Sequence, residues 1–525
     1  MQAATPYSQP TQSTPPVSDA RILDDLSNGA FEQALAACHA RLKTSALDAT
    51  AFHLAAIALR DSGQPQLALK YHARAIELAR TRPDHFFHLG QTFLALKLHS
   101  EAAAAFALAE RFAPKDVNIA RAAALCLYET GNPAALPRVE AILETHPTDL
   151  ASLSLYGTIL LALGRPKDAS AAYSRAWAIR PNGPTALALA KTAPLDQIKD
   201  IHADLSALTT QNCAMQDATY HFALAEIQHR MGDYSAAHDQ YVQGNALQNQ
   251  RSTFDIEAER RLCAEAKSLF STSVAAPPPS ETEGPQPIFI VGLPRSGSTL
   301  LSNILSAHSQ VTNLGETGEL QNAVRRLGAL QPDTHTEAFR HLRDGYLGSK
   351  PLSDCETPYS LDKNLGNYFY IGHILQAFPD ARILHIHRDP RAVCWSIFRQ
   401  CFSRGQWPCA YDPRNILGFH ACFRDLMAFW NRRFPRRILH VSYDSLVAAP
   451  DQEIPALIGS LGLHWEEACL TPERRQSMVA TASKSQVRRA IYKNSSQDWR
   501  CYEPYAGPWL SKLPDTIDWT AEGAA

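Results

Sequence analysis

The sequence predicts two structural parts: an all-α superhelix built from repeated helices, followed by an α/β domain with a parallel sheet flanked by helices. At 525 residues the chain exceeds the length at which a single core stops growing, so more than one domain is expected. Helical segments recur at a nearly fixed spacing in the first half. After a proline-rich stretch, short β-rich runs alternate with helix-like segments, which is typical of a parallel sheet covered by helices.

Glycines that follow helical segments recur regularly in the first half of the chain. They are Gly29, Gly63, Gly131, Gly164 and Gly232. The spacing is close to 34 residues, or twice that, and a repeat of this length is typical of paired helices stacked in an array.

Small and aromatic residues recur at fixed offsets within this repeat. Lys97 stands where one glycine is missing, and it is followed by Ala102, Phe106 and Ala109; Gly164 is followed by Ala169, Tyr173 and Ala176. We expect the alanines to let paired helices approach closely and the aromatic ring to wedge against the next repeat. The pattern resembles the tetratricopeptide family, with a generic alanine-rich helical bundle as the alternative. The resemblance implies a concave surface for a peptide or protein partner.

The composition changes after the repeats. Residues 271–287, "STSVAAPPPSETEGPQP", hold five prolines and indicate an extended linker. We therefore divide the chain into a disordered tail at 1–20, a repeat domain at 21–260, a linker at 261–284 and an α/β domain at 285–515. The strands expected in the last domain are "IFIV" (288–291), "ARILHIH" (381–387) and "RRILHVS" (436–442). Ligands of such sheets bind at the carboxyl ends of the strands.

The loop after the first of these strands, "GLPRSGSTLL", has the pattern of a phosphate-binding P-loop. Its backbone amides and the following helix dipole favour an anion. Hydroxyls and one guanidinium add donors, whereas the lysine of a magnesium-dependent triphosphate site is absent. We expect the loop to bind a terminal oxyanion group through Pro294, Arg295, Ser296, Gly297, Ser298 and Thr299.

This loop resembles the 5′-phosphosulfate-binding loop of sulfotransferases, particularly the tyrosylprotein branch, and "LHIHRDPRAVCWSIFRQ" is similar to their 3′-phosphate-binding segment. The chain is identified as a bacterial-type tetratricopeptide-repeat sulfotransferase. The resemblance implies 3′-phosphoadenosine-5′-phosphosulfate (PAPS) as the donor, without a metal. Arg388 and Ser396 could then reach one phosphate, because helical side chains tilt toward the helix N-terminus. The alternative is that Arg388 pairs with Asp389 or with a carboxylate at the sheet end.

The same resemblance assigns further residues. It implies that Lys363 in "LDKN" contacts the transferring sulfuryl group and that Tyr443 lines the adenosine pocket. A surface lysine and a core tyrosine are the alternatives. In the closing segment, Ser485 and Arg488 are expected to complete the 3′-phosphate site, with Ser483 as the other candidate serine and Arg489 and Lys493 as other candidate cations.

Sulfuryl transfer to a hydroxyl requires a base, and "LGETGEL" offers Glu316 and Glu319 at the start of an expected helix. The tyrosylprotein branch places its catalytic glutamate in a "GE" step, which corresponds to Glu316. An arginine of that branch is missing here, which leaves the peptide-tyrosine acceptor open. His385 and His387 are alternative bases, although packing at one face of the sheet is the favoured explanation for both.

Composition excludes other classes. The net charge of −2 gives no general attraction to nucleic acid, and no apolar run is long enough to span a membrane. The N-terminus lacks the features of a secretory signal. Eleven scattered cysteines indicate reduced thiols in a cytoplasmic protein, with a redox pair near Cys394 and Cys401 as the alternative.

Together these features predict a sulfotransferase that moves a sulfuryl group from PAPS to a hydroxyl of a peptide, protein, saccharide or small molecule. A P-loop kinase and a repeat scaffold with an inactive catalytic domain are the alternatives.

Overall fold

The computed structural model describes residues 18–209, 217–252, 254–271, 284–329, 335–403, 405–472 and 496–519. These residues separate into two compact units, Met1–Ala123 and Ala124–Ala525. Residues 1–17 of the predicted tail and residues 272–283 of the predicted linker lie outside the described residues.

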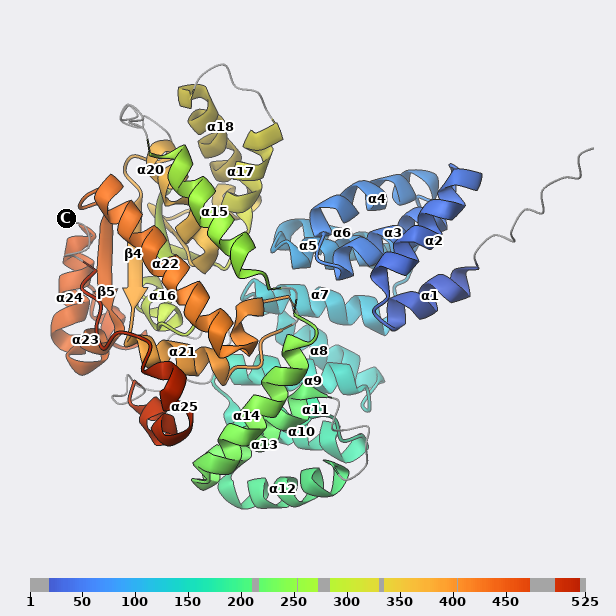
Figure 1. Ribbon diagram of the computed structural model, residues 1–525. Coiled ribbons are helices and arrows are strands. Elements are labelled where there is room, and N and C mark those ends of the chain that lie inside the picture. The colour runs from blue at the N-terminus through green and yellow to red at the C-terminus, as the bar shows by residue number, and fades with distance from the viewer. Residues whose placement is uncertain are drawn as a thin grey trace, which may run out of the picture. The chain divides into compact units, whose positions relative to one another are not determined.

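The first unit is entirely helical within its described residues (Figure 1). Its helices are α1 (Asp19–Ser27), α2 (Phe31–Thr44), α3 (Ala49–Asp61), α4 (Pro65–Leu78), α5 (Pro83–Ala95), α6 (His99–Phe112) and the first half of α7 (Val117–Glu129). Neighbouring helices pack in pairs, α3 against α4 and α5 against α6. Side chains cap the start of some of these helices; Asp48, before α3, accepts a hydrogen bond from the Ala51 amide at 2.8 Å.

The turns between paired helices confirm the predicted period. Gly63 and Gly164 adopt left-handed backbone angles, with φ of 86° and 77°. Lys97, which stands where a glycine is due, has φ of 59°. The same turn geometry is therefore kept even where the residue is not glycine, at some conformational cost.

The aromatic residues of the repeat pack against glycines. Phe106 on α6 lies against Gly90 on α5, where an added Cβ would stand 2.6 Å from the ring. Tyr173 lies in the same way against Gly157, at 2.6 Å. The ring thus fills the space left by a glycine on the preceding helix of its own pair, a contact that was not predicted.

The second unit begins with the remaining repeat helices. They are α8 (Ala135–Thr145), α9 (Leu150–Ala162), α10 (Pro166–Ile179), α11 (Gly183–Thr192), α12 (Leu195–Thr209), α13 (Ala218–Met231) and α14 (Tyr234–Asn249). A further helix, α15 (Ile256–Leu269), packs against α22 of the α/β part. The first residues of the predicted linker are therefore helical.

The α/β part contains a five-stranded, wholly parallel sheet in the order β2-β3-β1-β4-β5. The strands are β1 (Gln286–Val291), β2 (Val311–Gly315), β3 (Tyr359–Asp362), β4 (Arg382–His387) and β5 (Ile438–Ser442). The three runs predicted from the sequence are β1, β4 and β5. The two strands on one side, β2 and β3, were not predicted.

Helices cover both faces of this sheet (Figure 1). They are α16 (Ser298–Ser306), α17 (Glu319–Ala329), α18 (His335–Leu347), α19 (Lys350–Ser353), α20 (Ile371–Ala377), α21 (Pro390–Phe398), α22 (Pro413–Arg433), α23 (Tyr443–Ala448), α24 (Pro450–Ser460) and α25 (Glu503–Leu510). Short 3-10 helices η2 (Leu365–Tyr370), η3 (Pro408–Tyr411), η4 (Glu467–Leu470) and η6 (Asp498–Tyr502) lie in the connections.

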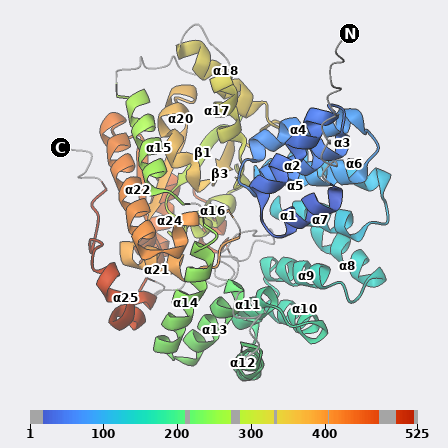
Figure 2. The ribbon, with the colours of Figure 1, turned by 45° about the vertical axis from the view of Figure 1, so that its right-hand side comes forward.

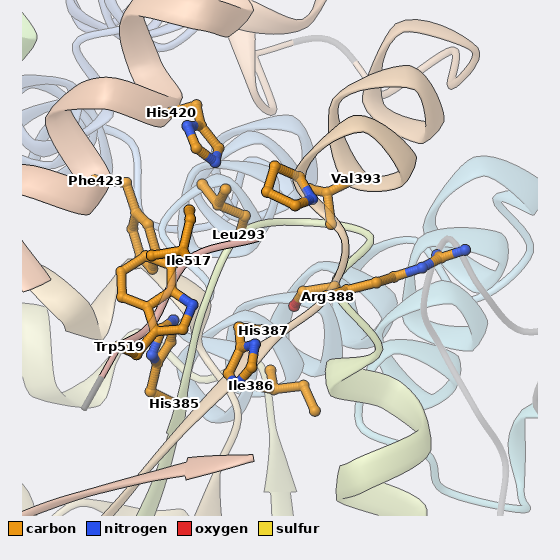
Figure 3. Close-up of a pocket in the computed structure, with 12 residues that line it drawn as sticks. Leu293, His385, Ile386, His387, Arg388, Val393, His420, Phe423, Ile517 and Trp519 are labelled. Carbon is orange, nitrogen blue, oxygen red and sulfur yellow. The ribbon is translucent and has the colours of Figure 1, made fainter. Parts of the chain in front are cut away.

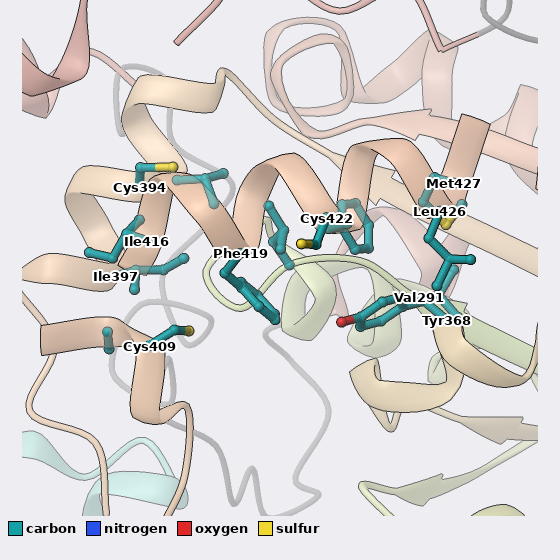
Figure 4. Close-up of a cluster of buried hydrophobic side chains, with 14 of the residues drawn as sticks. Val291, Tyr368, Cys394, Ile397, Cys409, Ile416, Phe419, Cys422, Leu426 and Met427 are labelled. Atoms are coloured by element: carbon teal, nitrogen blue, oxygen red, sulfur yellow. The ribbon is translucent and has the colours of Figure 1, made fainter. Parts of the chain in front are cut away.

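Successive side chains of β1 point to opposite faces of the sheet, and each face has its own hydrophobic core. Ile288 and Ile290 point into one hydrophobic core with α16, α23 and α24, whereas Phe289 and Val291 point into another with α20, α21 and α22. Figure 4 shows part of this second core, with Cys394 and Ile397 of α21 and Phe419 and Leu426 of α22 among its side chains.

The second core continues into the repeats. Phe222 of α13 and Tyr241 of α14 are buried in the same cluster as Trp395 of α21. Within the second unit, the last repeat helices therefore share one core with the α/β part, and Figure 2 shows α14 beside it.

Two sequence predictions concern the whole chain. No helix in the described part is long and apolar enough to cross a membrane. All cysteines for which a state is described are free thiols, Cys394 and Cys401 included, so no disulfide joins this pair.

Candidate active site

The loop after β1 is built as the sequence predicted. It leaves the strand at Gly292 and enters α16 at Gly297, whose φ is 105°. A Cβ on Gly297 would lie 2.2 Å from the Tyr443 ring, so the loop and the tyrosine can meet only because this residue is glycine. Arg295 is also left-handed, with φ of 70°, which marks a tight turn at the centre of the loop.

This contact gives a first testable prediction. Replacing Gly297 with alanine adds both left-handed strain and a clash with Tyr443, so we expect a loss of about 1–3 kcal/mol in the free energy of unfolding. Gly232→Ala is the matched control, because Gly232 has φ of 85° but open space around it. Thermal unfolding of both variants checks this; an equal loss in the two would show that the contact with Tyr443 contributes nothing.

Donor groups from the loop converge on one place. The Arg295 Nε donates a hydrogen bond to Ser396 Oγ at 3.0 Å. Ser296 is buried, and its Oγ has no hydrogen-bond partner among the described residues. A buried hydroxyl without a partner is costly, and an oxyanion held by the loop would satisfy it. The loop therefore fits an anionic ligand.

Arg388, at the end of β4, lies against this loop. Its Nη1 donates to the Arg295 carbonyl oxygen at 3.3 Å, and its Nε donates to Ser496 Oγ at 2.7 Å. The guanidinium also lies 4.8 Å from the centre of the Tyr443 ring. Arg295 therefore contacts both residues, Ser396 through its side chain and Arg388 through its backbone carbonyl oxygen. This arrangement joins the two predicted anion-binding segments into one site.

The carboxylate of Asp444 holds Ser496 in place beside Arg388. Asp444 accepts hydrogen bonds from the Ser496 hydroxyl and, at 2.9 Å, from the Asp389 amide. The Arg388 guanidinium is thereby linked to the Asp444 carboxylate through the Ser496 hydroxyl. Ser496 and Asp444 were not predicted from the sequence. Their only signals were an acidic residue after Tyr443 and a serine before Trp499.

The second half of the site lies at the ends of β2 and β3. Lys363 Nζ donates to Glu316 Oε1 at 2.6 Å; the lysine side chain is 4% exposed and the glutamate side chain 37%. Pairing of the strands causes this, because the Lys363 amide also donates to the Gly315 carbonyl at 2.9 Å. Lys363 is therefore a buried residue at a strand end and not a surface lysine.

The predicted local structure around Glu316 was wrong. It follows strand β2, and α17 begins only at Glu319. Glu316 therefore lies outside the helix, and the charged group beside it is the Lys363 ammonium. Glu319 is 2% exposed and starts the helix, so it is the less accessible of the two carboxylates.

A buried network holds the end of β3. Asp362 accepts hydrogen bonds from the Asn364 amide at 2.9 Å, from Asn367 Nδ2 at 3.1 Å and from the Tyr346 hydroxyl at 3.2 Å. Burial raises the pKa of Asp362 to about 7, although these hydrogen bonds oppose the shift. Asp362 was not predicted as a site residue, because one acidic residue beside Lys363 gives no distinctive signal in the sequence.

The two histidines of β4 pack in the sheet layer, as the sequence analysis favoured. His385 Nδ1 lies 2.9 Å from His440 Nδ1, and burial holds the pKa of His385 well below its usual value. His385 and His387 line a small cavity together with Trp519 and His420, while the Arg388 side chain points away from it (Figure 3). Leu293, Ser296 and Arg388 also line this cavity, so it adjoins the phosphate-binding loop.

The other predicted site residues lie partly in the loop and α16 and partly outside the described residues. Ser298 and Thr299 are buried in the first turn of α16, and Pro294 lies in the loop turn. Ser485, Arg488, Arg489 and Lys493 lie outside the described residues. Among the residues that are described, no three histidine, cysteine, aspartate or glutamate side chains are placed to hold a metal ion.

Two known protein families match this chain. Residues 287–467 match the sulfotransferase family, and residues 53–117 and 121–184 match the tetratricopeptide repeat. The first match contains β1, the loop, Glu316, Lys363, Arg388 and Tyr443.

Individual relatives are distant. An uncharacterised protein of Aquifex aeolicus (strain VF5) is 28% identical over 71% of this chain and 51% of its own length. Protein-tyrosine sulfotransferase 2 of Gallus gallus is 24% identical over 39% of this chain and 58% of its own length. The matches therefore span little more than half of these relatives. Among solved structures, the sulfotransferase domain of the Synechococcus PCC 7002 olefin synthase aligns with 47% of this chain and 95% of its own, at 21% identity and a TM-score of 0.31.

Proposed function

Because this chain joins tetratricopeptide repeats to a sulfotransferase-family domain, we propose that it transfers a sulfuryl group from PAPS to a hydroxyl acceptor. The observation that carries the proposal is the pairing of two arginines across one phosphate-binding loop. Arg295 lies in the loop after β1 and Arg388 follows β4, yet Arg388 Nη1 donates to the Arg295 backbone carbonyl oxygen at 3.3 Å. Both cationic residues therefore lie at one loop, which supports an anionic donor.

In this proposal the donor lies along the loop. Arg388, Ser496 and the Tyr443 ring bind the end that carries the 3′-phosphate. Arg295, Ser396 and the orphaned Ser296 hydroxyl bind the sulfuryl end, together with the amides at the start of α16. The planar guanidinium of Arg295 suits an oxyanion, because it can donate more than one parallel hydrogen bond.

The chemistry needs one base and cations near the leaving group. Glu316 accepts the proton from the acceptor hydroxyl as its oxygen bonds to sulfur. The bond from sulfur to the phosphate oxygen breaks at the same time, and the negative charge moves to the phosphate. Lys363 and Arg295 stabilise that charge. Once Glu316 is protonated, its pairing with Lys363 weakens, which leaves the ammonium available for the leaving group.

Reaction chemistry alone does not select the acceptor, since a hydroxyl of a tyrosine, a saccharide or a small molecule would react in the same way. We propose a phenolic hydroxyl, such as that of tyrosine in a peptide, because relatives such as Protein-tyrosine sulfotransferase 2 of Gallus gallus carry that name. The repeats would bind the peptide or a protein partner.

Calorimetry with 3′,5′-adenosine bisphosphate, the product of the donor, tests the proposal directly. We expect stoichiometric binding in the presence of a chelator, and we expect Arg388→Ala to weaken it by roughly 10- to 100-fold, since one charged hydrogen-bonding partner of the phosphate is lost.

Arg437→Ala is the matched control, because Arg437 is an arginine next to β5 whose guanidinium bonds the Pro379 carbonyl instead. Binding of ATP with magnesium, but not of the bisphosphate, would favour a kinase. Failure to bind either nucleotide would favour a repeat scaffold.

A further inference from the structure

A chain of hydrogen bonds runs from Trp519, near the C-terminus, into the middle of the sheet. Asn431 of α22 donates from Nδ2 to the Trp519 carbonyl oxygen at 3.0 Å, and its Oδ1 lies 3.1 Å from His440 Nε2. His440 Nδ1 in turn lies 2.9 Å from His385 Nδ1. Both Asn431 and His385 are buried. The chain therefore leads to the second ring nitrogen of His385, Nε2.

The Trp519 carbonyl fixes the position of each proton in this chain. A carbonyl oxygen only accepts, so Asn431 must turn its Nδ2 toward Trp519 and its Oδ1 toward His440. That amide oxygen also only accepts, so His440 carries its proton on Nε2. Burial lowers the pKa of His440 to about 4 and holds the pKa of His385 well below its usual value, so both rings are neutral near pH 7. The bare Nδ1 of His440 then accepts a hydrogen bond from the protonated Nδ1 of His385.

It follows that His385 Nε2 carries no proton and can only accept a hydrogen bond. His385 is 1% exposed, and this nitrogen has no hydrogen-bond partner among the described residues. A buried acceptor without a partner destabilises the fold, so a donor is required beside it.

The phosphate-binding loop reaches the same cavity. His385 and Ser296 both line it (Figure 3), and Ser296 Oγ is likewise buried without a partner in the described part of the chain. Leu293, Val393 and Phe423 give the cavity apolar walls, and its space is on the order of one water molecule. One small molecule that can donate two hydrogen bonds would satisfy both orphaned atoms.

We propose that a single water molecule in this cavity bridges His385 and Ser296, and that His385 is a positioning residue for the donor site. The water donates one hydrogen bond to His385 Nε2 and the other to Ser296 Oγ. The Ser296 hydroxyl then directs its own proton to the anion in the loop. This inference rests on the proposed function, in which that anion is the sulfuryl end of PAPS. It gives the histidine chain and the Trp519 segment a part in orienting one donor group of the loop.

Calorimetry with PAPS and the full-length protein, without an acceptor, tests the inference. Ser296→Ala should weaken PAPS binding by roughly 10- to 100-fold, since a hydrogen bond to a charged group is lost. His385→Phe keeps a ring but has no Nε2, and it should weaken PAPS binding by roughly fivefold or more as the water loses its place. In the Ser296→Ala background, His385→Phe should cost less than about twofold, because His385 acts through Ser296.

His420→Phe is the matched control, because His420 is buried and lines the same cavity but is not a member of the chain. Its PAPS affinity should stay near that of the wild type. A loss from His385→Phe that is equally large with and without Ser296 would overturn the inference, because a general distortion of the core adds to the effect of a second change.

A high-resolution crystal structure of the wild-type protein gives a measurement that does not depend on how the variants fold. We expect a water within hydrogen-bonding distance of both His385 Nε2 and Ser296 Oγ, and a cavity without one would contradict the proposal. Failure of the wild-type protein to bind PAPS would instead overturn the proposed function itself.

Discussion

Replacing Glu316 with glutamine should lower kcat by a factor on the order of 10²–10⁴, the range expected when a general base is lost. Glutamine keeps the shape and one oxygen for Lys363, but it cannot accept the proton of an attacking hydroxyl. Rapid-quench measurement of the first turnover would show whether the chemical step itself has slowed. Affinity for 3′,5′-adenosine bisphosphate should be unchanged, because Glu316 does not contact the donor nucleotide in the proposed arrangement.

Glutamine is preferable to alanine for this purpose. Lys363 has only 4% of its side chain exposed, so alanine at position 316 would strand a nearly buried ammonium without its partner at 2.6 Å. Such a loss is strongly destabilising and would mix a folding defect with a catalytic one.

Glu319→Gln separates the two carboxylates that the sequence offered. Glu319 is 2% exposed at the start of α17, and we expect its variant to retain most of the wild-type kcat. If Glu319→Gln were the slow variant and Glu316→Gln the active one, the assignment of the base would be reversed.

The sequence predicted those parts of the fold that repeat or that bury a continuous apolar strand. The glycine period located the turns, including the one at Lys97, and the apolar runs predicted β1, β4 and β5. Strands β2 and β3 escaped prediction because "VTNLG" and "YSLD" are short and partly polar. Their pairing comes from the neighbouring strands, and a tertiary effect of this kind leaves little trace in local composition.

The site shows the same division. Residues within one motif, such as Arg295 and Gly297, were found because loop chemistry is local in sequence. The pairing of Lys363 with Glu316 depends on β2 lying beside β3, and the link from Arg388 to Ser496 joins residues far apart in the chain. The resemblance to sulfotransferases supplied Lys363 and Glu316 as candidates, but the physical cause of their proximity is the strand order.

The boundary between repeats and catalytic domain was the least predictable feature. A helix such as α14 carries the same alanine and aromatic pattern as earlier repeats, and nothing in that pattern marks its outer face as part of another core. Only the buried contacts of Tyr241 and Asn245 with α21 reveal it.

Replacing Arg295 with alanine should lower kcat by on the order of 10²–10³, as expected when one preorganised donor to the transferring group is removed. The Arg295 carbonyl that accepts the hydrogen bond from Arg388 belongs to the backbone and survives the change. Affinity for 3′,5′-adenosine bisphosphate, which lacks the sulfuryl group, should therefore fall by less than about fivefold. Arg295→Lys keeps the charge but loses the planar fork that reaches Ser396, so its kcat should be intermediate.

A variant in which bisphosphate affinity and kcat fall by equal factors would show that Arg295 shapes the loop and does not act on the transferring group. Since its φ of 70° strains lysine and alanine alike, the difference between these two variants isolates the contribution of the charge.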